Sequence, residues 1–194
     1  QLFEIDKSVM NIDSDFTIVE LEQGSPEWHK WRSDGIGATN AKVAMGKHGK
    51  GFDRLLRVKA GLEEESDYLN VAMILGAELE PEARTKYISR TGTIVKPVCV
   101  QSTKHKWLRA SLDGLTEDHS GVVEIKCGAR VYEIVDETAS IPDNYYPQTQ
   151  HILAVTGLWS LDFWCHWPGS PDLLVNVPRN DDYIKNLLEK EADF

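Results

Sequence analysis

The chain has 194 residues, 41% of them hydrophobic, and a formal net charge of −10 at pH 7. This length supports one substantial hydrophobic core and is short for two, so we expect a single domain over residues 1–194. The sequence has no run of about 20 apolar residues, and its acidic, polar start lacks the basic and apolar regions of a signal peptide, which excludes a membrane protein and favours a soluble protein of the cytoplasm.

The first elements along the chain are a strand and a helix. Residues 16–21 are mostly apolar or β-branched and predict a short strand. Ser25 followed by Pro26 is typical of a helix start, with serine as the N-cap and proline as the first helical residue. Gly35 and Gly37 mark the end of this helix.

Three further helical segments are predicted in the first half of the chain. Thr39 is placed to cap a helix over 40–46, and residues 52–61 have apolar residues at helical spacing before a terminating glycine. Residues 71–90 predict one or two helical runs, in which Pro81 either begins the second run or kinks the first.

From residue 93 onwards, short β-branched or alternating segments are separated by turn residues, as is typical of strands. We predict strands over 93–101, 107–112, 121–127, 159–167 and 173–178, and helices over 144–157 and 180–192. Helices and strands of this kind on one chain predict an α/β fold, in which a central mixed β-sheet is flanked by helices.

Basic residues are concentrated in two segments despite the acidic total. Residues 29–60 hold eight Lys or Arg against two Asp, and residues 84–109 hold seven against no acidic residue. This asymmetry indicates one positive groove on a negative body, a feature of proteins that bind nucleic acid. On charge alone, two solvated helix faces explain the pattern equally well.

The cysteines and histidines do not predict a metal or disulfide framework. The three cysteines are odd in number and contain no C-x-x-C pair, so we expect them to fill the core of a protein in a reducing compartment. The six histidines show no metal-ligand spacing, and His151 is expected to be a packing residue.

The segment SLDGLTEDHSGVVEIKC contains the candidate catalytic residues. Asp113 is expected where one strand ends and a turn follows, and Glu124 and Lys126 lie two residues apart on the next strand. Because side chains alternate across a strand, Glu124 and Lys126 share a face while Ile125 points into the core, and a hairpin would bring Asp113 beside them.

Two neighbouring carboxylates repel each other unless a cation lies between them, and Mg²⁺ prefers such oxygen ligands. Phosphodiester hydrolysis needs a metal to activate water and a cation to orient that water or offset charge on the phosphate. An acid-x-Lys triplet alone is a weak signal, since about one or two arise by chance in such a chain. The alternative is a surface Glu–Lys pair on an edge strand.

The order of five motifs, EQGSPEWHKWRSDGIGAT, LGAELEPEAR, ASLDGL, VEIKC and YYPQTQ, resembles the phage lambda exonuclease and YqaJ-type viral recombinase family, a branch of the PD-(D/E)XK nuclease superfamily. The resemblance spans roughly residues 18–167. It implies a restriction-endonuclease-like core and gives the chain a specific set of expected functional residues.

The resemblance implies that Asp113, Glu124 and the backbone carbonyl of Ile125 hold the catalytic metal and that Lys126 assists the attacking water. Glu80 matches the helical glutamate near the metal, with Glu82 as the weaker candidate, and Gln148 matches the glutamine that joins the active site from a following helix. Taken alone, Glu80 and Gln148 are ordinary polar surface residues.

Arg32 and Thr39 match the residues that bind a 5′-terminal phosphate in lambda-type exonucleases. An arginine offers a planar fork to phosphate oxygens, and a helix start at Thr39 would favour an anion. Without the resemblance, Thr39 is an N-cap and Arg32 a surface charge. Trp28, in the same W-x-x-x-R motif, is expected to pack in the core.

The resemblance implies a Mg²⁺-dependent exonuclease, with Mn²⁺ as an alternative metal, that degrades linear duplex DNA from the 5′ end and leaves 3′ single strands for recombination. It also implies a homotrimeric ring, a single-strand annealing recombinase as partner and, for a phage protein, the host bacterial cytoplasm. Two other functions stay open: a PD-(D/E)XK endonuclease, and a non-catalytic DNA-binding or assembly module. One departure is Leu112, where the superfamily usually has proline before the aspartate.

Overall fold

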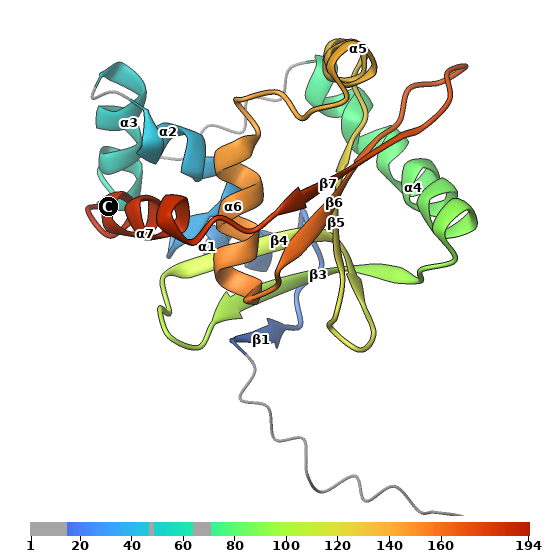
Figure 1. Cartoon of the computed structure of the whole chain (residues 1–194). Coiled ribbons are helices and arrows are strands. Elements are labelled where there is room, and N and C mark those ends of the chain that lie inside the picture. The colour runs from blue at the N-terminus through green and yellow to red at the C-terminus, as the bar shows by residue number, and fades with distance from the viewer. Residues whose placement is uncertain (1–14, 47–48, 64–70) are drawn as a thin grey trace, which may run out of the picture.

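The computed structural model describes residues 15–46, 49–63 and 71–194. Its centre is a seven-stranded sheet with helices on both faces (Figure 1). The strands are β1 (Phe16–Val19), β2 (Ile36–Gly37), β3 (Val95–Ser102), β4 (Leu108–Thr116), β5 (Val122–Lys126), β6 (Ser160–Cys165) and β7 (Leu173–Pro178). The helices are α1 (Pro26–Ser33), α2 (Ala41–Met45), α3 (Lys50–Lys59), α4 (Val71–Thr91), α5 (Ala129–Thr138), α6 (Tyr146–Thr156) and α7 (Asp181–Glu191).

The sheet confirms the predicted mixed topology. Its order is β1-β3-β4-β5-β6-β7, and the short β2 pairs with the start of β4. β5 is parallel to β6 and β2 is parallel to β4, whereas the other neighbours are antiparallel. β5 is therefore an inner strand, and the edge-strand alternative for Glu124 and Lys126 is wrong.

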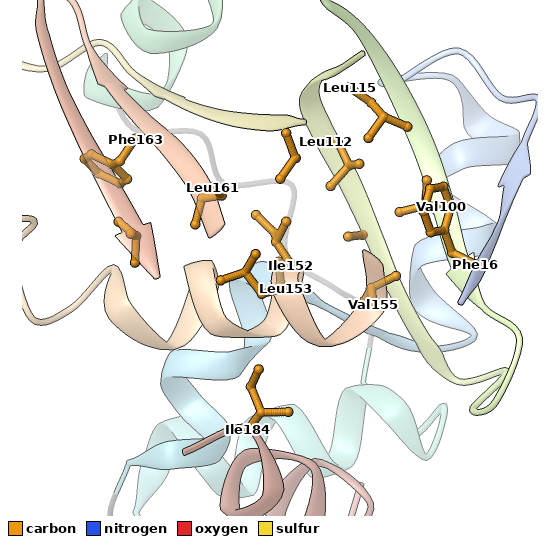
Figure 2. Packing of buried hydrophobic residues seen from close by; sticks show 14 of the residues in the cluster. Phe16, Val100, Leu112, Leu115, Ile152, Leu153, Val155, Leu161, Phe163 and Ile184 are labelled. Carbon is orange, nitrogen blue, oxygen red and sulfur yellow. The ribbon is translucent and has the colours of Figure 1, made fainter. Parts of the chain in front are cut away.

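Two hydrophobic clusters lie on opposite faces of the sheet. On the larger side, α6 lies across the strands, and Ile152, Leu153 and Val155 contact sheet residues such as Leu112 (Figure 2). On the other side, Ala83 and Tyr87 of α4 pack against β5 and β6. Side chains alternate between the two faces of the sheet along β5. Val123 and Ile125 are buried under α4, so Glu124 and Lys126 point to the face that carries α6.

Several predicted boundaries are corrected by the structure. Asp113 lies inside β4 rather than at its end, because the strand continues to Thr116 and the turn begins only there. The segment around Pro81 is one continuous helix, since the burial of Ala83 and Tyr87 against the sheet extends α4 past the proline. The sequence prediction also lacked β2 and α5, although Val131 and Val135 repeat at helical spacing in α5.

The prediction that Thr39 caps a helix is wrong. Thr39 lies in a 3₁₀ turn, Ala38–Asn40, and Asn40 occupies the N-cap position of the following short helix. Ser25, in contrast, is the N-cap of α1 and accepts a hydrogen bond from the Trp28 backbone N–H at 3.2 Å, as predicted.

Other expectations concern cysteines, basic residues and membrane spans. Cys99 and Cys165 are buried, Cys127 is half-buried, and all three are free thiols. Lys47 of the first basic segment lies outside the described residues. Within the described ranges, no helix has the length and apolar character that a membrane span requires.

Candidate active site

The candidate site begins where β4 and β5 diverge. The two strands pair through Leu115–Val122 and Gly114–Val123, and the next opposing residues would be Asp113 and Glu124. Instead of a backbone pair there, the Asp113 carboxylate accepts a hydrogen bond from the Ile125 N–H at 2.7 Å. The side chain thus replaces a strand partner, and the opening between the strands is lined by carboxylates.

The carbonyl of Asp113 receives its hydrogen bond from α4. The Nε of Arg84 donates to it at 2.7 Å, and the Nη2 of Arg84 makes an ion pair with Glu80 one turn earlier on the same helix. Glu80 is therefore held at the edge of the site through Arg84. Glu82 lies on the exposed side of α4 and pairs with Lys86 at 2.8 Å, so it is separate from the site.

Glu124 is the centre of a small polar network. Its side chain is 2% exposed, its Oε1 forms an ion pair with Lys126, and the same oxygen accepts a hydrogen bond from Gln148 Nε2 at 2.6 Å. The Lys126 ammonium also lies 5.2 Å from the ring centroid of Tyr145, just before α6. The structure thus brings together the four residues Asp113, Glu124, Lys126 and Gln148.

The carboxylates hold protons more tightly than usual. Burial, together with the charge of Asp113, raises the pKa of Glu124 to about 7. Burial also raises the pKa of Asp113, against the opposing effect of Lys126, and burial and Asp113 raise the pKa of Glu80. The pKa of Lys126 is raised because Glu124 and Asp113 outweigh its burial, so this side chain is a cation at neutral pH.

The oxygen donors fit a divalent metal. The positive charge of Lys126 does not bring the pKa of Asp113 or of Glu124 down to its ordinary value. A divalent ion would supply the positive charge that is still needed. Across the part of the chain that the structure describes, no three His, Cys, Asp or Glu side chains converge as a ready-made metal cluster. Asp113 and Glu124 would therefore need the Ile125 carbonyl and waters as further ligands, a set that suits Mg²⁺, which usually keeps several waters.

A pocket of about 190 Å³ connects these residues to the expected phosphate-binding residues. Asp113, Glu124, Lys126 and Gln148 lie on its wall together with Arg32 and Thr39. Arg32 Nη2 donates to the Thr39 hydroxyl at 3.1 Å, so these two residues form one unit although Thr39 does not cap a helix.

Trp28 is a pocket residue rather than core filler. It is half-buried, its indole N–H donates to the Ser111 hydroxyl at 2.8 Å, and the Arg32 guanidinium lies 4.4 Å from its ring centroid. The tryptophan therefore fixes the orientation of Arg32. The sequence prediction also lacked Arg84 and Arg109. The position of Arg84, four residues after Glu80 on a helix, could have predicted their ion pair. No sequence pattern predicted that Arg109 lines this pocket.

His151 is buried, as expected of a packing residue, but it is also hydrogen-bonded at both ring nitrogens. Nδ1 lies 2.7 Å from a Glu191 oxygen of α7, and Nε2 lies 2.8 Å from the Arg109 carbonyl of β4. It thereby joins α6, which carries Gln148, to α7 and to the sheet.

The mixed sheet flanked by helices is a fold of the PD-(D/E)XK type. The model of the YqaJ-like viral recombinase domain matches residues 27–159, well over half of the chain, and the chain belongs to this family. Both the predicted family and the predicted fold class are thereby confirmed. Comparison with curated proteins gave no match.

Solved structures agree with this assignment. An alkaline exonuclease (LHK-Exo) from Laribacter hongkongensis is similar with a TM-score of 0.77 and 26% identity, over 87% of this chain and 90% of that one. The structure of LHK-Exo in complex with dAMP has a TM-score of 0.75 and 28% identity, with the same coverage. A phage-related exonuclease from Haemophilus somnus 129PT, with a TM-score of 0.58 and 11% identity over 81% of this chain and 90% of that one, supports the fold alone.

Gly35 packs closely against Trp107 and against Arg109, which lines the pocket. A Cβ there would lie 2.6 Å from the Trp107 carbonyl oxygen and 2.7 Å from the Arg109 side chain. Gly35→Ala should therefore lower the free energy of unfolding by about 1–3 kcal/mol, the usual cost of overpacking, in urea denaturation. Gly51→Ala is the matched control, because a Cβ there meets nothing within 4 Å and the residue lies in α3. Equal stability of the two variants would contradict the close packing at Gly35.

Proposed function

We propose that the chain is a Mg²⁺-dependent exonuclease that degrades linear duplex DNA from the 5′ end and leaves 3′ single strands for recombination. The observation that carries this proposal is that one pocket is lined both by Asp113, Glu124 and Lys126 and by Arg32 and Thr39. A terminal phosphate bound by Arg32 and Thr39 would place the terminal nucleotide beside the carboxylates.

The chain's own residues would perform distinct parts of the reaction. When bound by Asp113, Glu124 and the Ile125 carbonyl, Mg²⁺ would polarise the phosphoryl oxygen and lower the pKa of water. Lys126 stays protonated, so it would donate hydrogen bonds to the attacking water and to phosphate oxygens rather than accept a proton. Gln148 would keep the Glu124 carboxylate in its orientation through their hydrogen bond.

The relatives support this reaction class. LHK-Exo is an alkaline exonuclease whose structure with dAMP shows a nucleoside monophosphate bound to that protein, the chemical class that a DNA exonuclease releases. By family resemblance, we further propose that the chain acts as a single domain in a homotrimeric ring, with a single-strand annealing recombinase as partner and the bacterial cytoplasm as its compartment. Mn²⁺ is expected to substitute for Mg²⁺.

A plasmid assay separates this proposal from its rivals. The duplex of a linearised plasmid incubated with Mg²⁺ is expected to be converted to single strands, the covalently closed circle is expected to stay intact, and EDTA should stop the reaction. Nicking or cutting of the closed circle would instead identify an endonuclease. Binding of linear DNA without any Mg²⁺-dependent degradation would identify a non-catalytic DNA-binding module.

A further inference from the structure

Arg84 makes two polar contacts that join helix α4 to the candidate site. Its Nε donates to the Asp113 carbonyl of β4 at 2.7 Å, and its Nη2 forms the ion pair with Glu80 of α4. The Arg84 side chain is only 15% exposed. One planar guanidinium therefore contacts the backbone of a proposed metal ligand and the carboxylate of a second acidic residue at the same time.

The position of Arg84 along α4 directs it to the site. Gly76, Glu80 and Arg84 are four residues apart, so they lie on one face of the helix. A Cβ at Gly76 would lie 3.6 Å from the Cys127 carbonyl, just after the end of β5, so this face passes close to the strand. Besides burial, the charge of Asp113 raises the pKa of Glu80, so the two carboxyl groups lie near each other. This face of α4 therefore borders the place where β4 and β5 diverge.

The packing of α4 on the sheet rests on other residues. Ala83 is fully buried, and Tyr87 is 3% exposed and donates from its hydroxyl to Asp162 of β6 at 2.8 Å. A largely buried ion pair adds little net stability, because the cost of removing its charges from water offsets their attraction. Fold stability alone therefore explains the Arg84–Glu80 pair poorly.

We propose that Arg84 is a positioning residue that holds Glu80 and the Asp113 strand in the arrangement that binds the catalytic metal. This inference rests on the exonuclease function proposed above. Mg²⁺ usually keeps several waters, so a carboxylate outside direct contact with the ion can still accept hydrogen bonds from its water ligands. Residues that orient the groups around a metal typically contribute about ten- to hundredfold to metal affinity or activity.

The first measurement is Mn²⁺ binding without DNA, followed through the electron paramagnetic resonance signal of the free ion. Arg84→Gln is expected to raise the Kd for Mn²⁺ by about tenfold and to lower kcat/KM on linear duplex DNA by about ten- to hundredfold. Arg90→Gln is the matched control. Arg90 also lies on α4 and donates from Nη1 to a backbone carbonyl, that of Asp172, but it does not line the pocket. Arg90→Gln should leave both values within about twofold.

A double-mutant cycle separates positioning from bracing of the helix. In a Glu80→Ala background, Arg84→Gln should lose at least about threefold less in kcat/KM than in the wild-type background, because only the Asp113 contact is then left to remove. Equal losses in both backgrounds, or an Arg84→Gln protein that binds Mn²⁺ like the wild type, would overturn the inference and leave the exonuclease function standing. A wild type that binds Mn²⁺ but degrades no DNA would refute the function alone, and a wild type that binds no Mn²⁺ would refute both.

If Arg84→Gln melts below the assay temperature, Arg84→Lys decides the question. Lysine keeps the charge but lacks the planar fork that reaches the Asp113 carbonyl and Glu80 together. A Kd for Mn²⁺ at least about threefold above the wild-type value supports the inference, and a wild-type Kd contradicts it.

Discussion

Replacing Lys126 with alanine is expected to lower kcat on linear duplex DNA by about a thousandfold or more, while the Kd for DNA changes by less than about threefold. Lys126 is the only described cation in ion-pair contact with Glu124, and its raised pKa keeps it charged at the pH of the reaction. Its loss removes the donor that would orient water and offset the charge on the phosphate. DNA binding should survive because Arg32 and Arg109 remain in the pocket.

Lys86→Ala is the control for Lys126→Ala. Lys86 also pairs with a glutamate, Glu82, but on the exposed side of α4, and its replacement should leave kcat within twofold. Single-turnover rates with saturating Mg²⁺ and binding in Ca²⁺ would measure the two effects separately. Near wild-type cleavage by Lys126→Ala would mean that the carboxylates of β4 and β5 are incidental.

Asp113→Asn is expected to abolish cleavage and, in the metal-free protein, to raise the melting temperature at pH 8. Burial raises the folded-state pKa of Asp113, and Asp113 in turn helps to raise that of Glu124 to about 7. Carboxyl groups with raised pKa values stabilise the folded state while they are protonated, and that stability is lost as the pH rises through the folded pKa. At pH 8, above the pKa of Glu124, the Glu124 carboxylate lies beside the buried Asp113 side chain, so replacing Asp113 with a neutral amide should add about 1–2 kcal/mol, or roughly 2–8 °C.

Differential scanning fluorimetry in EDTA at pH 5 and pH 8 would measure this effect, and the stabilisation should shrink at pH 5. Asp118→Asn is the control, because the pKa of Asp118 is shifted in the opposite direction. Hydrogen bonds from Thr116 and Ser120 lower the pKa of Asp118 to about 2, so its carboxylate is favourable in the fold and its replacement should not raise the melting temperature. A lower melting temperature for Asp113→Asn at pH 8 would show that the acidic pair is well compensated without metal.

The fold was largely predictable because its signals are local. Ser25–Pro26 marks a helix start, and the β-branched residues of β5 and the alternating apolar residues of β6 mark strands. The errors arose where tertiary contacts decide the outcome. Only the pairing with β4 makes β2 a strand. The packing of Tyr87 on the sheet likewise decides between the one and the two helical runs that the sequence left open around Pro81.

The convergence of the proposed site residues was predictable where their partners lie nearby in sequence. Glu124 and Lys126 share a face by strand geometry alone, whereas Gln148 and Glu80 were assigned through the family resemblance. Arg109 could not be predicted as a pocket residue, because its orientation depends on the Trp31 carbonyl, 78 residues earlier. The role of Arg84 depends in the same way on the divergence of β4 from β5, which exposes the Asp113 carbonyl.

The most direct test of the central claim is a strand-labelled digestion. Linear duplexes with a 5′-phosphate, labelled at either the 5′ or the 3′ end of each strand, are incubated with Mg²⁺ and with EDTA. The 5′ label should be released first as a mononucleotide, the 3′ label should persist in single strands, and EDTA should prevent both changes. Degradation that starts at 3′ ends, or no degradation with Mg²⁺ present, would contradict a 5′-end exonuclease built on Asp113, Glu124 and Lys126.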